Sequence, residues 1–235
     1  MGAIFKREFR TYFYSPLGYI FIAIMWLFSA YFFNVVLQNS STYLQYMFSN
    51  MFTILSLLIP MLTMRLMSED KKLKTDQLLL TAPVNISGVV VGKYLAACLV
   101  FIISISSTIL FGIVMATFTT PDWNVFLGNF LALFLLGAAL IAIGLFVSSL
   151  TENQMVAAII TYAIFIFITI LDTIADSLPS GLSFLGTALT QLSFMNRYND
   201  FVSGILNVSH IIFFVSIIVA FNFLTIRILE KKRWS

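Results

Sequence analysis

The sequence predicts an all-α integral membrane protein, a single domain over residues 1–235 with six transmembrane helices. The first observation is composition: 60% of the 235 residues are hydrophobic, only 10% are charged, and the mean hydropathy is +0.99. Soluble domains carry about 25% charged residues. The second observation is patterning, because apolar runs of about 20 residues, the length that crosses a bilayer, alternate with short polar breaks.

Each predicted span ends at charged residues or at turn-forming residues. The breaks include QNSST (38–42), TTPDW (119–123) and SSLTENQ (148–154). No small-x-small cleavage site follows the first apolar run, so we expect no cleaved signal peptide. Cys98 is the single cysteine, so the chain cannot form an intrachain disulfide. The six spans are predicted at 17–37, 47–66, 91–117, 125–147, 154–172 and 210–227.

The distribution of basic residues predicts the orientation of the spans. With six spans, 12 of the 13 Lys and Arg residues lie on one side, in the N-terminal segment, between spans 2 and 3, and after span 6. Only Arg197 lies on the other side. Loops rich in Lys and Arg stay in the cytoplasm. We therefore expect a multi-pass membrane protein with both termini cytoplasmic.

Residues 1–15 are predicted to form an interfacial amphipathic helix. On a helical wheel the aromatic residues share one arc with Met1, and the basic residues lie beside it. Such a helix lies in the membrane interface, with its cations toward anionic headgroups of the membrane lipids. The simpler alternative is a mere orientation signal. The residues concerned are Phe5, Phe9, Tyr12 and Phe13, with Lys6, Arg7 and Arg10.

Charge is concentrated between spans 2 and 3. Seven of the twelve residues from Arg65 to Asp76 are charged, whereas the stretch from Thr11 to Met64 has no charge. The second half, TDQLLLTAP, begins with the cap-like Thr75 and ends at Pro83, which predicts a short helix with a leucine-rich side. Such a face on segment 65–82 either rests on the bilayer or docks in a partner's groove. A solvated loop is the equally weighted alternative.

The stretch SGVVVGKY (87–94) is not a phosphate-binding loop. That motif needs four residues between its glycines, followed by Lys and Ser or Thr, whereas here three residues separate the glycines and Tyr94 follows Lys93. We interpret Gly88 and Gly92 as a small-xxx-small packing face. Lys93 is interpreted as an anchor whose ammonium group reaches the interface.

Segment 173–209 is apolar, but its parts are too short to span. We predict two short re-entrant helices there, before the last span, and these cover the extracytoplasmic end of the helix bundle. Asp172 and Asp176 lie one turn apart, which suits a solvated helix end better than a cation site because no third ligand joins them. Arg197 and Asp200 are spaced for a structural pair. His210 is interpreted as an interface residue at the start of span 6.

No catalytic constellation is present, so the chain is not predicted to be an enzyme. One histidine, one cysteine and no clustered carboxylates within the spans argue against a protease, an oxidase or a proton pump. We predict no metal, no cofactor bound by this chain and no nucleic-acid partner. A stand-alone secondary transporter is disfavoured because no inverted repeat is visible.

Four stretches of the chain are similar to the ABC-2 type permease family, the membrane subunits of ATP-binding cassette exporters. LLLTAPV (78–84) and SSLTENQ also resemble the gliding-motility-associated permease subunits of Bacteroidetes. The chain departs from the family pattern at Lys74–Asp76 and at Asn207–His210. The four stretches are KREFRTYFYSPLGYI (6–20), SEDKKLKTDQLLLTAPVN (68–85), GLFVSSLTENQMVAAII (144–160) and LSFMNRYNDFVSGILNVSHIIFF (192–214).

The resemblance implies an ABC-2 exporter-type fold and a coupling helix that sits in a groove of the ATPase subunit. In this sequence Glu69 corresponds to the family's acidic residue in that loop, and Glu152 and Asn153 belong to a second, smaller contact. The implied coupling residues are Glu69, Asp70, Lys71, Lys72, Leu73, Lys74, Thr75, Asp76, Leu78, Leu79 and Leu80.

The resemblance also implies the partners. These are two ABC ATPase subunits that hold ATP and Mg²⁺, and a second permease copy or a homologue. A possible extracytoplasmic auxiliary subunit is left open. The cargo is expected to be amphipathic or lipid-like, because the spans are rich in Phe and Met. The alternative is a non-transporting complex that passes ATP-driven motion to envelope or motility proteins.

Overall fold

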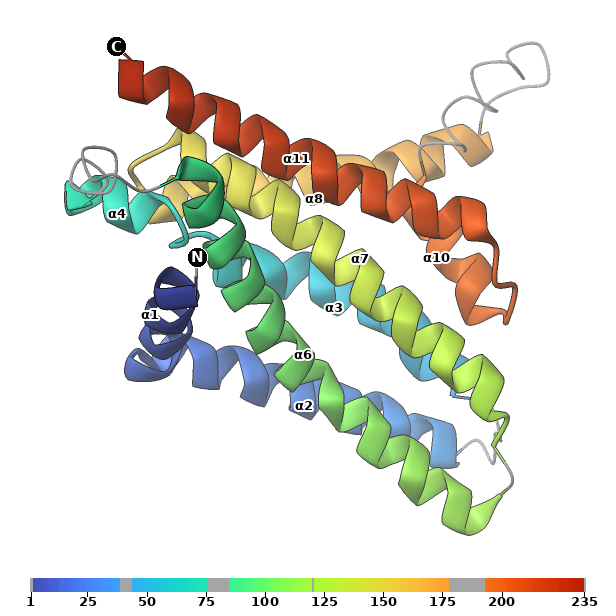
Figure 1. The fold of residues 1–235 in the computed structure, drawn as a ribbon. Helices are drawn as coiled ribbons and strands as arrows, with labels where there is room; N and C mark the ends of the chain where they lie inside the picture. The colour runs from blue at the N-terminus through green and yellow to red at the C-terminus, as the bar shows by residue number, and fades with distance from the viewer. Residues whose placement is uncertain (1, 39–43, 76–84, 120, 178–192, 235) are drawn as a thin grey trace.

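The computed structural model describes residues 2–38, 44–75, 85–119, 121–177 and 193–234, and these form helices joined by short turns (Figure 1). The all-α prediction is confirmed for this part of the chain. The helices are α1 (Gly2–Tyr14), α2 (Pro16–Gln38), α3 (Gln45–Thr63), α4 (Ser68–Lys72), α6 (Ile86–Phe118), α7 (Trp123–Leu150), α8 (Gln154–Ser177), α10 (Phe194–Val202) and α11 (Val208–Trp234).

Within the described residues, five helices are long and apolar enough to cross a membrane. They are α2, α3 together with the turn and α4 that continue it, α6, α7 and α11. α8 contributes a shorter apolar helix, Gln154–Ile170, at the position of the fifth predicted span. The structure therefore describes a multi-pass membrane protein, while the count of six spans stays a prediction.

Polar side chains fix where the long helices begin. The Asn85 side chain accepts a hydrogen bond from Ser87 N (3.3 Å) and caps α6, and Asp122 accepts one from Asn124 N (3.1 Å) and caps α7. Each cap satisfies a backbone N–H that has no partner within the helix. α6 therefore begins earlier than the span predicted at 91–117.

α7 is the central helix of the bundle, because it packs against α3, α6, α8, α10 and α11 (Figure 1). Glycines allow two of these close approaches. A Cβ at Gly144 would lie 2.2 Å from Thr63 Oγ1 on α3, and a Cβ at Gly137 would lie 2.2 Å from the Phe101 ring on α6. Small residues at helix interfaces let backbones approach closely in membrane proteins.

The two termini, α4 and the first turns of α6 lie at the same end of the bundle, which we call the charged end (Figure 1). The predicted grouping of these basic segments on one side is confirmed as an arrangement within the molecule. The predicted break at 148–154 is shorter than expected, because α7 continues to Leu150 and includes Ser148 and Ser149.

The opposite end is built from the α6–α7 connection and α10. The short helix α10 lies in the second of the two stretches predicted to be re-entrant before the last span, and the re-entrant course stays a prediction. The first stretch falls largely on 178–192, outside the described residues. Tyr198 on α10 is buried and donates a hydrogen bond to Phe48 O of α3 (2.6 Å). The Arg197 guanidinium lies 4.3 Å from the Phe213 ring centroid, and His210 Nε2 lies 3.6 Å from Asp200 Oδ2.

Candidate functional site

The charged end contains a buried ion cluster centred on Lys93, in the third turn of α6. The Lys93 side chain is 2% exposed, and its ammonium donates a hydrogen bond to Leu66 O (2.6 Å). Nζ also lies 3.1 Å from Glu8 Oε1 on α1 and 2.7 Å from Asp70 Oδ2 on α4. The Asp70 contact is a close ion pair. One cation therefore joins α1, the α3–α4 turn, α4 and α6.

This geometry corrects the interpretation of Lys93 as an anchor reaching toward the interface. The ammonium is buried within the molecule, where two carboxylates pair with it. Burying an unpaired ammonium costs several kcal/mol, and paired carboxylates offset that cost. The packing face predicted at Gly88 is not seen either, because a Cβ there would meet no atom within 4 Å.

Arg7 and Thr75 complete the charge balance of the cluster. Arg7 Nη2 lies 2.6 Å from Glu8 Oε1 and 3.7 Å from Asp70 Oδ2, so two cations face two carboxylates. Burial lowers the pKa of Arg7, but the hydrogen bond to Glu8 and the charges of Glu8 and Asp70 raise it by more, so the net pKa shift is upward. The Thr75 hydroxyl donates to Asp70 Oδ1 (2.9 Å), which ties the start of the 76–84 segment to the cluster.

A second set of contacts holds α1 on the turn between α3 and α4. Arg65 donates to both carboxylate oxygens of Glu69, at 2.7 and 3.1 Å, and to Ser15 Oγ (2.7 Å), directly after α1. The buried Tyr12 hydroxyl donates to Leu62 O (2.9 Å). A guanidinium that forks onto one carboxylate fixes orientation as well as distance.

Ser148 near the end of α7 ties that helix to the same turn. Its Oγ accepts hydrogen bonds from Met67 N (3.0 Å) and Ser68 N (3.1 Å) and donates to Met64 O (3.1 Å). Lys71 donates to Ser149 O, one of the carbonyl groups at the C-terminus of α7. A cation is favourable there because the helix dipole is negative at this end. The α7–α8 turn therefore lies against the α3–α4 segment.

The outer surface of this assembly carries other predicted coupling residues. Lys72, Leu73 and Lys74 are exposed, with Leu73 64% accessible, and Glu152 and Asn153 are exposed in the α7–α8 turn. Asn153 Oδ1 also accepts a hydrogen bond from Met155 N (3.0 Å), so it stabilises the start of α8. α4 contacts both α7 and α8, and the two predicted contact regions thus adjoin each other.

The structure divides the predicted site residues into three groups. Glu69, Asp70, Lys71 and Thr75 have partners within the chain. The exposed residues are Lys72, Leu73, Lys74, Glu152 and Asn153. Asp76, Leu78, Leu79 and Leu80 lie outside the described residues. On α1, the Phe5 and Phe9 rings are stacked with centroids 6.2 Å apart, and the Phe13 ring is tilted against Phe9 at 5.0 Å. Lys6 and Arg10 are exposed.

Sequence reasoning missed Glu8 and Ser148. Glu8 lies between Phe5 and Tyr12 on the apolar arc of α1, and a carboxylate on such an arc requires a buried partner. Lys93 is a cation within an apolar helix, so it requires a buried partner of opposite charge in the same way. Ser148 carries no such signal, because a serine near a helix end is common and its partners are backbone groups of a distant segment.

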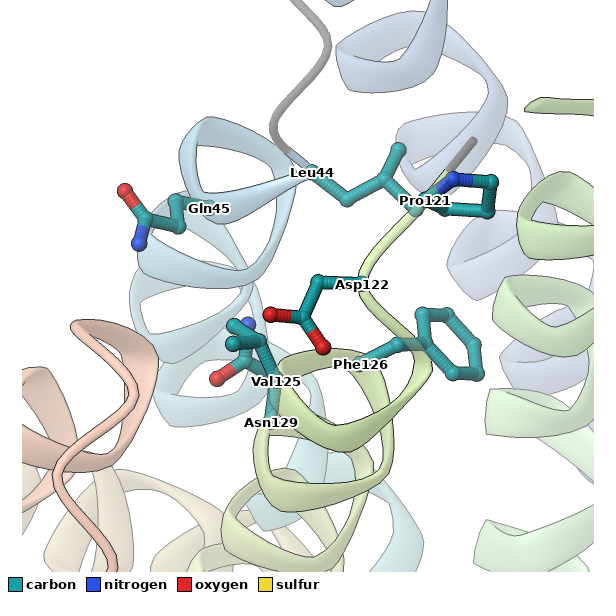
Figure 2. A pocket seen from close by; sticks show the side chains of 7 residues that line it. All are labelled: Leu44, Gln45, Pro121, Asp122, Val125, Phe126 and Asn129. Atoms are coloured by element: carbon teal, nitrogen blue, oxygen red, sulfur yellow. The ribbon is translucent and has the colours of Figure 1, made fainter. Parts of the chain in front are cut away.

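A cavity at the opposite end of the bundle is a weaker candidate for a functional site (Figure 2). It measures about 80 Å³ and lies between the start of α3 and the start of α7. Asp122 points into it but already caps α7. The Asn129 side-chain amide is oriented so that its nitrogen donates hydrogen bonds to Val125 O and Phe201 O. Within the described residues no group of three or more His, Cys, Asp and Glu side chains is placed to hold a metal ion.

A comparison with curated proteins gave no match. A family model described as ABC-2 family transporter protein matches residues 2–234, which is nearly the whole chain and includes every helix of the charged end. This chain belongs to the ABC-2 family of transporter proteins.

Proposed function

We propose that this chain is the membrane-spanning permease subunit of an ABC-2 type exporter, and that it couples ATP hydrolysis by separate ATPase subunits to export. The observation that carries the proposal is the family match over residues 2–234. The chain supplies no nucleotide site of its own, because SGVVVGKY lacks the spacing of a phosphate-binding loop. ATP and Mg²⁺ would be held by the partner ATPase.

The charged end supports a role in receiving force from a partner. Its exposed surface combines Lys72, Leu73 and Lys74 with the α7–α8 turn, and the leucine-rich stretch 78–80 follows Lys74 in the sequence. Behind that surface, Lys93 and Ser148 connect the segment to α6 and α7. A push on α4 is therefore transmitted to two central helices through ion pairs and hydrogen bonds. This end would face the cytoplasm, where basic segments are retained.

The export pathway is proposed to lie between two permease chains. Six helices are too few to enclose a pathway, so two copies, or this chain and a homologue, would pair about a symmetry axis. ATP binding would draw the two charged ends together and tilt the membrane halves, a rigid-body change at an interface. The cargo would be amphipathic or lipid-like.

The test is a pull-down of the tagged full-length chain in mild detergent, with identification of the proteins that co-purify. We expect an ABC-type ATPase at about one copy per permease. Replacing Leu78 and Leu79 by Asp in one chain is expected to remove it, because two carboxylates cannot occupy an apolar groove. The variant must still insert and elute as the wild-type chain does.

A matched control makes the same change in net charge, −2, at the same end. Lys231→Gln with Arg233→Gln alters the exposed end of α11, outside the proposed contact. The control is expected to retain the ATPase. Recovery of the folded chain without any ATPase would overturn the proposed function, and equal loss in both variants would overturn the assignment of the contact to 78–80.

A further inference from the structure

The helical path from α3 into α4 is interrupted, although its own sequence does not require an interruption. One apolar stretch long enough to cross a membrane covers Gln45–Lys72, yet α3 ends at Thr63 and α4 begins only at Ser68. The residues between them are MRLM (64–67), and methionine, arginine and leucine are strong helix formers. Pro60 lies one turn earlier within α3, where a proline disturbs the turn that precedes it. Contacts from outside the segment must therefore hold the interruption.

The backbone N–H groups at the interruption do not follow the helical pattern. In a continuous helix each N–H donates to the carbonyl group four residues earlier. Leu66 N donates only three residues back, to Thr63 O (3.1 Å). Met67 N and Ser68 N both donate to the Ser148 hydroxyl of α7, at 3.0 and 3.1 Å. Insertion of a side chain into the hydrogen-bond ladder in this way bends a helix.

The carbonyl groups of this stretch also have partners on other helices. Each donor is a buried side chain, and each comes from a different helix. The donors are Tyr12 of α1 to Leu62 O (2.9 Å), Ser148 of α7 to Met64 O (3.1 Å) and Lys93 of α6 to Leu66 O (2.6 Å). We call Tyr12, Ser148 and Lys93 the holding residues. Three helices thus hold the α3–α4 interruption from outside it.

The same backbone groups have a second set of partners within their own helix. Without the holding residues, the N–H groups of 66–68 can donate to the carbonyl groups of 62–64, as in any α-helix. Met64 already has helical dihedral angles, with φ −54° and ψ −32°. Met67 has φ −118° and ψ −34°, and a helix needs φ near about −63°. At these two residues a continuous helix therefore requires the rotation of one dihedral angle, and it leaves none of the three N–H groups unpaired.

We propose that residues 64–67 are a two-state hinge. In the present state the holding residues keep α3 and α4 as separate helices, and in the second state Gln45–Lys72 is one continuous helix. Two packings that satisfy the same backbone groups make such an element bistable. Straightening would change the direction of α4, which carries the exposed Lys72. A use of the hinge in coupling to an ATPase rests on the proposed function, whereas the hinge itself is a property of this chain alone.

The test is NMR of the purified full-length chain in lipid nanodiscs, with ¹³C-labelled methionine. The shift of the Met67 ¹³Cα resonance reports the dihedral angles of that residue, and the variant Met67→Leu identifies the resonance by its loss. The wild-type chain is expected to give mainly the resonance of the present, interrupted state.

Tyr12→Phe and Ser148→Ala each remove one hydroxyl that holds the present state. Loss of one buried hydrogen-bond partner shifts an equilibrium by about tenfold. We expect each variant to show a second Met67 resonance at helical shift values, about tenfold more populated than in the wild-type chain. In Ser148→Ala the fraction that stays interrupted has lost the acceptor of Met67 N, so amide exchange there also becomes faster.

Two matched controls remove hydroxyl groups that do not touch the interruption. Tyr14→Phe changes a ring that is 85% exposed, and Ser149→Ala removes a hydroxyl that donates to Phe146 O of its own helix. Both controls are expected to keep the wild-type resonance. A single unshifted Met67 resonance in both Tyr12→Phe and Ser148→Ala, or the same second resonance in the controls, would overturn the hinge. The experiment needs no ATPase, so its failure is distinct from a failure of the pull-down.

Discussion

Lys93 Nζ lies 3.1 Å from Glu8 Oε1, although Glu8 belongs to the N-terminal helix and Lys93 to the third turn of α6. Both side chains are nearly inaccessible, 2% and 11% exposed. The pair joins a helix predicted to lie in the membrane interface to one that crosses the membrane. Asp70 shares the same ammonium, so the cluster links α4 to both helices.

Lys93→Met is expected to destabilise the protein strongly. The change keeps the apolar stem but leaves Glu8 and Asp70 buried near each other with only Arg7 to balance them. Breaking a buried pair by removing one partner costs about 3–5 kcal/mol. The midpoint of thermal unfolding of the purified chain in detergent measures the effect.

The neutral triple variant separates ion pairing from packing. Lys93→Met with Glu8→Gln and Asp70→Asn removes the unbalanced charges, so it should recover part of the stability that Lys93→Met loses. Lys72→Met, at an exposed position on the same segment, is the matched control and should change little. If the Lys93→Met and Lys72→Met variants unfold at the same temperature, the buried ion cluster does not stabilise the fold.

Sequence patterns predict the helices well because hydrophobic length and charged breaks are local properties. The spans expected at 17–37, 125–147 and 210–227 correspond to α2, α7 and α11. The charged segment near Glu69 was also predicted as the functional region. Its internal partners were not, because Lys93 and Ser148 reach it only after α6 and α7 have folded against α3. Whether a given charge is buried or exposed depends on such packing.

The contrast between Lys71 and Lys74 shows the same limit. The family resemblance implies that both face the ATPase partner. In the structure Lys71 binds Ser149 O and stabilises the end of α7, whereas Lys74 is exposed in a turn with a positive φ of 56°. Tertiary contacts, which the run of charges does not encode, divide the run into internal and external residues.

Ser148→Ala is expected to loosen the α3–α4 turn. It removes the acceptor of Met67 N and Ser68 N, and an unsatisfied buried N–H costs about 1–3 kcal/mol. Ser149→Ala is the control, because the Ser149 hydroxyl donates only to Phe146 O within its own helix. Amide hydrogen exchange should become faster at Met67 and Ser68 in the Ser148 variant alone. Equal exchange rates in both variants would contradict the assigned role of Ser148.

Arg65→Lys is expected to make the junction between α1 and α2 more mobile. Lysine retains the charge but cannot fork onto Glu69 and reach Ser15 Oγ at the same time. Limited proteolysis should therefore cleave near Ser15 faster than in the wild-type chain. Arg227→Lys is the control, since Arg227 forms an exposed pair with Glu230 on one helix. An unchanged cleavage rate in Arg65→Lys would show that the guanidinium does not hold the junction.

Gly144→Ala is expected to destabilise the contact between α7 and α3, whereas Gly88→Ala is not. A Cβ at Gly144 would lie 2.2 Å from Thr63 Oγ1 and 2.7 Å from Thr63 Cβ, so the helices must separate. Overpacking of this kind costs about 1–3 kcal/mol. A Cβ at Gly88 meets nothing within 4 Å, and replacing a helical glycine by alanine stabilises by about 0.5–1 kcal/mol. Thermal unfolding of the two variants should therefore shift in opposite directions, and a downward shift of similar size in both would contradict the close approach of α7 to α3.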